Sequence, residues 1–241
     1  RRGSLRWSAV LVAQGILGAL LIVGVFTGPD ATSYMTFVRD GQDPNYLLDP
    51  NAYEGNFFPM GYPAFLTATV ALAGGSTLLY EVMSVLMGLA VTTLVFMMMR
   101  GHSSHVRVST AAAIALCPSV LWMMQNNGYE MLLSVLIVAS LFLVLRIRSG
   151  TAKYARTLTV VAGMMLGGAA LVQSKVLVLL PIFLVLLRQS RVRVVLAACG
   201  VLVLPGIWGL RNFFVMGNPY PFSSNAGMGL WLGNNPVTID G

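Results

Sequence analysis

A few charged side chains stand apart in a chain that carries little charge, and their types suit the transfer of a group from a phosphate. Asp30 follows Gly28 and Pro29, and a carboxylate in that position can serve as a general base. Lys175 and Arg211 are isolated cations, of which an Arg makes a forked contact with phosphate and a Lys acts as a point charge. A base and two cations together can activate a hydroxyl and stabilise a leaving phosphate.

Each of these residues also has a structural interpretation. Ala31, Tyr34, Met35 and Val38 recur at helical spacing, which predicts a short amphipathic surface helix with Asp30 as its N-cap. Glu130 opens an apolar segment, where a carboxylate is stabilised by the helix dipole. Lys175 and Arg211 can extend to lipid phosphates from the ends of apolar segments, and Arg39 in the surface helix can do the same.

The composition indicates that these residues belong to a membrane protein. Hydrophobic residues make up 56% of the 241 residues and charged residues only 10%, with a mean hydropathy of +0.77. Soluble domains carry about 25% charged residues. We therefore predict an all-α polytopic membrane protein with one transmembrane domain over residues 1–241. About seven spans are expected, at 10–27, 80–99, 108–124, 131–147, 157–173, 176–190 and 194–210.

The charges predict which side of the membrane each connection occupies. All but three of the fifteen Lys and Arg fall in alternate connections, which the positive-inside rule assigns to the cytoplasm together with the N-terminus. The three exceptions are Arg39, Lys175 and Arg211, which lie on the outer side with the acidic residues. The net charge of +7 is thereby explained as a topology signal, and we expect no nucleic-acid partner.

Two apolar stretches can be placed in the membrane in more than one way. Basic clusters lie at both ends of 157–190, so we interpret this stretch as a hairpin of two spans that turns at Gln173, Ser174 and Lys175. Residues 62–73 are too few to cross comfortably and are interpreted as an interfacial or re-entrant segment. The outer face then holds the loop 28–61, the short loop 124–130 and the tail 211–241.

The outer segments carry a resemblance to a known enzyme class. The chain resembles the GT-C class of integral-membrane glycosyltransferases, in particular bacterial relatives of protein O-mannosyltransferases and lipid A aminoarabinose transferases. The resemblance rests on these segments: Pro29-Asp30 followed by Tyr34, Pro59-Met60-Gly61-Tyr62-Pro63, Glu130 at the start of a span, Lys175 before Leu180-Pro181, and a tail with Trp208-Gly209-Leu210-Arg211-Asn212, Ser224-Asn225-Ala226-Gly227 and Gly233-Asn234-Asn235-Pro236. Met60 stands where members often have a second proline. Members usually continue for several more spans, so we expect this chain to correspond to their N-terminal module, with the C-terminal part absent.

The resemblance implies an inverting glycosyltransferase. Such an enzyme moves a sugar from a polyprenyl-phosphate carrier to a hydroxyl acceptor on a cell-envelope glycan, lipid or protein. It implies that Asp30 is the catalytic base, that Lys175 and Arg211 hold the donor phosphate, and that Glu130 orients the acceptor. Tyr34, Asn212 and Asn234 complete the implied substrate-binding set. No cofactor and no metal are expected.

The implied location is the bacterial plasma membrane, with the active site on the outer, periplasmic face and membrane lipids around the spans. One alternative is a non-catalytic membrane assembly subunit with the same fold. Another is a transporter of lipid-linked sugars, which the sequence favours less because no Asp, Glu, Lys or Arg lies near the middle of a predicted span.

Overall fold

A computed structural model describes residues 2–22, 36, 48–50, 59–74, 78–125 and 128–223 of the chain. Within these ranges the regular structure is entirely helical. The helices are α1 (Arg2–Ile22), α4 (Gly61–Leu72), α5 (Leu78–Met98), α6 (Ser104–Ala115), α7 (Pro118–Gln125), α8 (Glu130–Arg148), α9 (Ala155–Val172), the 3-10 helix η2 (Ser174–Leu179), α10 (Leu180–Leu187) and α11 (Arg191–Met216).

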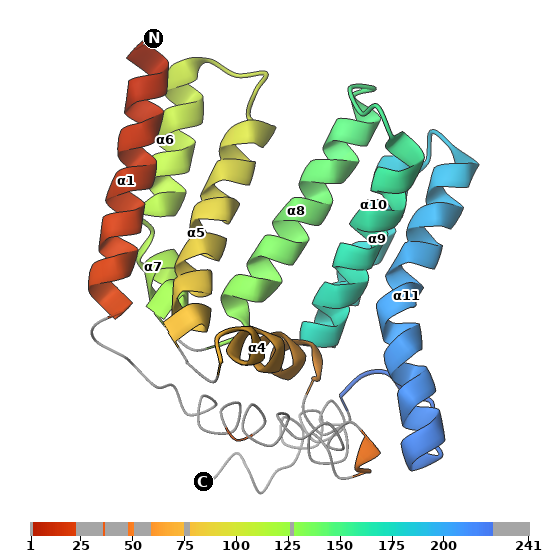
Figure 1. The fold of residues 1–241 in the computed structure, drawn as a ribbon. Coiled ribbons are helices and arrows are strands. Elements are labelled where there is room, and N and C mark those ends of the chain that lie inside the picture. The colour runs from red at the N-terminus through yellow and green to blue at the C-terminus, as the bar shows by residue number, and fades with distance from the viewer. Residues whose placement is uncertain are drawn as a thin grey trace, which may run out of the picture.

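The helices form two groups that stand side by side (Figure 1). One group contains α1, α5, α6 and α7, and the other contains α8, α9, α10 and α11. Contacts between α5 and α8 join the groups, and α4 lies across one end of the bundle. The N-terminus and the connections α5–α6, α8–α9 and α10–α11 lie at the opposite end, which we call the basic end. We call the other end the α4 end.

Four of these helices, α5, α8, α9 and α11, are long and apolar enough to cross a membrane. A fifth crossing is formed if α6 and α7, which are bent by 49° relative to each other, make one broken span. Residues 7–20 and 174–187 form shorter apolar helices. The chain is thus a membrane protein whose described residues are helical and contain four or five candidate spans, and seven crossings stay a prediction.

The predicted span 108–124 is occupied by two helices, α6 and α7, with a break between them. Pro118 begins α7, and a proline has no N–H to continue the preceding helix and disfavours helical backbone at the residue before it. The helix α6 accordingly ends at Ala115, and Leu116 and Cys117 form the break. The predicted hairpin at 157–190 does turn where expected, since α9 ends at Val172 and Gln173 is extended.

Helices α9 and α11 approach closely because small residues face each other. A Cβ added to Gly163 would overlap the carbonyl oxygen of Ala197, and one added to Gly167 would overlap that of Val201. Pro205 stands four residues after Val201 within α11 and has no N–H to donate to that carbonyl. The Val201 carbonyl therefore faces Gly167, where a Cα–H contact can partly satisfy it. Small residues permit such backbone contact between helices in membranes.

The first group is held by a buried amide and an aromatic stack. The Gln14 side chain in α1 is fully buried, and its Nε2 donates to the carbonyl of Gly88 in α5 at 3.3 Å. Toward the basic end, the rings of Trp7 and Phe96 stack with centroids 4.0 Å apart. The Arg107 guanidinium lies 4.1 Å from the Phe96 centroid, a cation–π contact that joins α6 to α5. The Trp7–Phe96 stack joins α1 to the same side chain.

Helix α4 corresponds to the segment that was interpreted as interfacial or re-entrant. Its twelve residues extend about 18 Å, less than a bilayer core. It lies across the bundle end instead of along the other helices (Figure 1). Its Tyr62, Leu66 and Val70 are buried. Gly61 permits this close packing of α4 on the end of α9, because a Cβ there would overlap the backbone at Leu171 and Val172.

Candidate functional site

The two ends of the bundle differ in charge among the described residues. Basic residues gather at the basic end: Arg100, Arg107, Arg146, Arg148, Lys153, Arg156, Arg188, Arg191 and Arg193. Glu81 and Glu130 lie in the first turns of α5 and α8, and these turns are at the α4 end. Lys175 at the start of η2 and Arg211 near the end of α11 are the cations of the α4 end. The segregation predicted from the sequence is therefore present in the fold.

An apolar cluster organises the α4 end. Its buried members come from α4, α9 and α11: Tyr62, Leu66, Val70, Leu171, Val172 and Trp208. Tyr129 at the start of α8, Met60 before α4 and Phe222 in the tail pack against it. We call this set the α4 cluster. It joins four segments that are far apart in the sequence, and all four carry residues that the sequence analysis singled out.

Arg211 is held firmly at this end. Its Nη2 donates to the carbonyl of Asp49 at 2.8 Å, and its Nη1 donates to Asn212 Oδ1 at 3.0 Å. The guanidinium carbon also lies 4.8 Å from the ring centroid of Trp208, a cation–π distance. The side chain thus connects α11 to the segment around Asp49. This is more structural engagement than the snorkelling alternative requires.

Asn212 has an internal role that its sequence does not reveal. The side chain is 1% exposed, and its Nδ2 donates to the carbonyl of Tyr220 at 2.7 Å. Gly217 ends α11 in a left-handed conformation, with φ 69°, and the tail folds back along the helix. Gly209 accommodates this return, because a Cβ there would lie 2.7 Å from the carbonyl oxygen of Pro219. Gly209 and Asn212 therefore have a structural explanation in the return of the tail. Trp208 has one in the α4 cluster, and Arg211 has one in its contact with Asp49.

Lys175 is in a different situation. It lies just after the turn between α9 and η2, and its side chain is exposed. Among the described residues no hydrogen bond or ion pair engages its ammonium group. Beside it in the sequence, Gln173 Nε2 donates to the Tyr129 hydroxyl at 3.2 Å and so ties this turn to the start of α8. The turn that carries Lys175 is thereby positioned against the α4 cluster.

Glu130 presents an unpaired carboxylate oxygen. It is the first residue of α8, and its Oε2 is buried with no hydrogen-bond partner in the described part of the chain. The carboxylate lies against Gly128, where any Cβ would overlap Oε2. A buried carboxylate oxygen without a hydrogen-bond partner destabilises the folded protein, and binding of a hydrogen-bond donor would remove that destabilisation. A hydroxyl of a bound molecule is one group that satisfies it.

Three of the predicted site residues, Asp30, Tyr34 and Asn234, lie outside the described residues. So do Arg39, the run 224–236 and all of the predicted surface helix 31–38 except residue 36. The structure thus places Glu130, Lys175, Arg211 and Asn212 at one end of the fold. It directly joins only Arg211 and Asn212 of these.

Sequence reasoning missed the supporting polar residues. Gln173 was identified as part of a turn and Tyr129 as part of a loop, but not as hydrogen-bond partners. Their separation of 44 residues leaves no local signal of the contact. The tail carbonyl that Asn212 binds is eight residues away, and only the left-handed turn at Gly217 hints at the return.

Comparison of the chain with protein-family models, with curated proteins and with solved structures finds no match.

Proposed function

We propose that this protein is an inverting glycosyltransferase of the GT-C type, which moves a sugar from a polyprenyl-phosphate carrier to a hydroxyl acceptor on the outer face of a bacterial plasma membrane. The observation that carries the proposal is the convergence of four separated segments on the α4 cluster. These segments are the Pro59–Tyr62 element, the start of α8, the end of α9 that leads into the turn with Lys175, and the end of α11. They are also the segments on which the resemblance rests.

The charges at the α4 end support this chemistry. The exposed Lys175 can meet a lipid-linked phosphate as a point charge. Arg211, fixed by Asp49 and Trp208, adds a second positive charge at the same end. The unpaired Oε2 of Glu130 can accept a hydrogen bond from a substrate hydroxyl. A donor phosphate, a positive environment for its developing charge and an acceptor contact are the requirements of this transfer.

Asp30 is the proposed base in this reaction. It takes the proton of the acceptor hydroxyl as that oxygen attacks the anomeric carbon. The bond between the anomeric carbon and the phosphate oxygen breaks with inversion, and the polyprenyl phosphate leaves with the electron pair. The cations stabilise the charge that forms on the leaving phosphate.

A second candidate is a non-catalytic membrane subunit, and one observation favours it. Trp208, Gly209, Arg211 and Asn212 form a unit whose contacts all have a structural explanation. Gly209 and Asn212 meet the returning tail, Trp208 packs in the α4 cluster, and Arg211 binds the Asp49 carbonyl. A protein that keeps this unit for stability alone would have the same contacts. The two candidates differ in whether Asp30 is needed for transfer.

The test is Asp30→Asn in the full-length protein, with Asp43→Asn in the same loop as the matched control. Asn caps a helix about as well as Asp but cannot accept the proton, so sugar transfer should fall by roughly 10²–10⁴-fold. Thermal stability and donor binding should stay close to wild type, and Asp43→Asn should transfer normally. Radiolabelled sugar incorporation from a polyprenyl-phosphate donor measures this. Transfer at the wild-type rate by Asp30→Asn would refute Asp30 as the base.

A further inference from the structure

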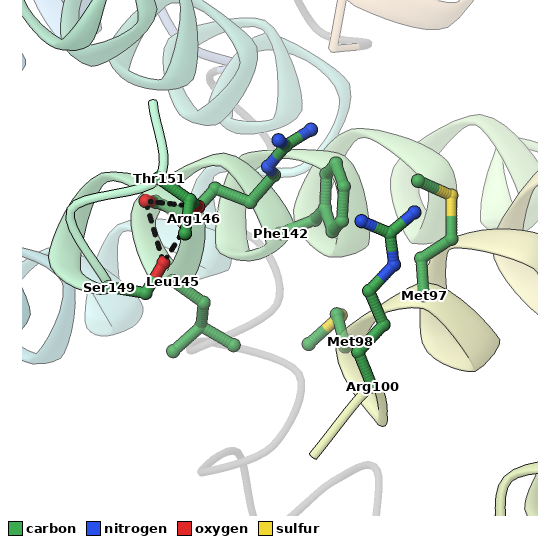
Figure 2. Close-up of a pocket in the computed structure, with 8 residues that line it drawn as sticks. All are labelled: Met97, Met98, Arg100, Phe142, Leu145, Arg146, Ser149 and Thr151. Atoms are coloured by element: carbon green, nitrogen blue, oxygen red, sulfur yellow. Dashed lines mark hydrogen bonds between the residues drawn. The ribbon is translucent and has the colours of Figure 1, made fainter. Parts of the chain in front are cut away.

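A cavity of about 280 Å³ opens between the ends of α5 and α8 at the basic end. Its lining residues come from the end of α5, from Arg100 just beyond it, and from the last turns of α8 and the turn that follows (Figure 2). This is the opposite end of the bundle from the α4 cluster. The proposed transfer reaction makes no use of it.

Two guanidinium groups flank an aromatic ring in this cavity. Figure 2 shows Arg100 and Arg146 on either side of the Phe142 ring. The Arg146 guanidinium carbon lies 5.7 Å from the ring centroid, within cation–π range. No hydrogen bond or ion pair occupies the guanidinium of Arg100 or Arg146 in the part of the chain that the structure describes.

The acidic residues of the same helices are far away. Glu81 and Glu130 lie in the first turns of α5 and α8, whereas the cavity lies at their last turns. From Glu130 to Arg146 the helix rises by about 24 Å, so this carboxylate is far beyond contact distance of the cavity. The positive charge of the cavity is therefore not neutralised from within these two helices.

The helix ends themselves weaken this charge only partly. The C-termini of α5 and α8 each carry about half a negative charge, so two guanidinium groups leave a net positive site. At α8 the exposed end is also capped. The carbonyl oxygen of Arg146 accepts from Ser149 Oγ at 2.9 Å and from Thr151 Oγ1 at 3.3 Å. The two hydroxyls are 2.9 Å apart and are satisfied by these contacts, so they shape the wall and the arginines supply the donors.

The rest of the lining is apolar. Met97 and Met98 from α5 and Leu145 from α8 complete the wall with Phe142. A free inorganic anion makes no favourable contact with an apolar wall. A phospholipid needs cationic contacts for its phosphate and apolar contacts for its glycerol and acyl carbons. Methionine side chains adapt readily to irregular partners. Basic pockets between transmembrane helices at a membrane surface suit anionic lipid headgroups.

We propose that the α5–α8 cavity binds the phosphate of an anionic glycerophospholipid from the leaflet at the basic end. Arg100 and Arg146 hold the phosphate from two sides of Phe142. The acyl chains continue into the bilayer along the apolar surface of the bundle. The lipid would then fill the space between the two helix groups that α5 and α8 join.

The test compares two pairs of substitutions that remove the same charge from the same end. Arg100→Gln with Arg146→Gln alters the cavity, and Arg188→Gln with Arg191→Gln alters two exposed arginines of the α10–α11 turn. The full chain in neutral detergent is titrated with palmitoyl-oleoyl phosphatidylglycerol, and native mass spectrometry gives the dissociation constant. Loss of two charge-assisted contacts should weaken binding by at least about tenfold in the cavity pair. The control pair should change it by less than about threefold.

Three further arms make the result decisive. Palmitoyl-oleoyl phosphatidylcholine should bind the wild type more weakly than the anionic lipid, and millimolar sodium phosphate should not displace the anionic lipid. The pair Arg100→Lys with Arg146→Lys keeps the charge and should bind better than the Gln pair, which controls for damage to the fold. Equal losses in the two Gln pairs would overturn the site in favour of diffuse attraction. Unchanged binding in the cavity pair, or displacement by inorganic phosphate, would overturn it as well.

Discussion

Lys175 and Arg211 were predicted together from the same signal, yet their surroundings differ. Arg211 donates to the Asp49 carbonyl and to Asn212, and it lies on Trp208. Removing it would disturb the contact with the segment around Asp49 as well as any ligand, so its loss would not isolate a binding role. Lys175 is exposed, and no hydrogen bond or ion pair engages its ammonium group within the described part of the chain. It is therefore the better residue with which to test the phosphate site.

Lys175→Ala should weaken binding of a polyprenyl-phosphate-linked donor by roughly 1.5–3 kcal/mol, the value of a charge-assisted contact. That corresponds to a dissociation constant about 10–150-fold larger. Lys153→Ala is the matched control, because it removes a Lys from the basic end, where its ammonium group lies 5.4 Å from the Tyr154 ring centroid. Isothermal titration in detergent measures both. Equal donor affinity in the two variants would return Lys175 to the role of a lipid anchor.

At the level of the elements, the closest helix pair depends on glycines. Gly163 and Gly167 in α9 and Gly200 in α11 lie where a Cβ would overlap backbone of the partner helix. Leu166, Ala169 and Val201 are buried beside them in one cluster. The pair α9–α11 connects the α10–α11 turn at the basic end to the α4 cluster. The distance between α9 and α11 therefore determines where the end of α11 lies.

Gly167→Ala should destabilise the protein, and Gly168→Ala should not. A Cβ at Gly167 meets the Val201 carbonyl, which cannot move without shifting α11, whereas one at Gly168 meets Leu204 Cδ1 at 3.3 Å, the end of a flexible side chain. Overpacking of this kind costs roughly 1–3 kcal/mol, while replacing a helical Gly by Ala gains up to about 1 kcal/mol. Thermal unfolding in detergent measures the difference. A Gly167→Ala protein as stable as Gly168→Ala would show that α9 and α11 separate at no cost.

The whole molecule has its charges arranged by end. Apart from Lys175 and Arg211, the described Lys and Arg gather where the N-terminus and three connections meet, and the first turns of α5 and α8 at the other end are acidic (Figure 1). Basic loops are retained on the cytoplasmic side during insertion. The α4 end should then face outward, as the proposed transfer reaction requires.

Thiol labelling tests this orientation on intact cells. In a background with Cys117→Ala and Cys199→Ala, Asn218→Cys in the exposed part of the tail should react with an impermeant maleimide, and His102→Cys in the α5–α6 turn should not. Both thiols should react after the cells are permeabilised. Labelling of His102→Cys from outside would reverse the assigned orientation.

Several features followed from the sequence because they depend on local properties. A long apolar run between basic clusters predicts a helix and its ends, and α5, α8, α9 and α11 lie within a few residues of the expected ranges. The turn at Gln173 followed from the charges at the two ends of a stretch too long for one span. Pro118 also contained the signal for the break between α6 and α7, but hydropathy averaged over a window conceals it.

Other features were decided only when the helices packed. Apolar side chains are interchangeable in a hydropathy pattern, so nothing local predicts that Gly167 meets Val201, that Tyr129 meets Gln173, or that Asn212 binds the returning tail. The cavity beside Phe142 likewise exists because α5 and α8, from different helix groups, end side by side. The types of the charged residues indicated chemistry only at the outer surface. Packing of distant segments decided which of those residues became partners and which, like Lys175, stayed exposed to solvent or lipid.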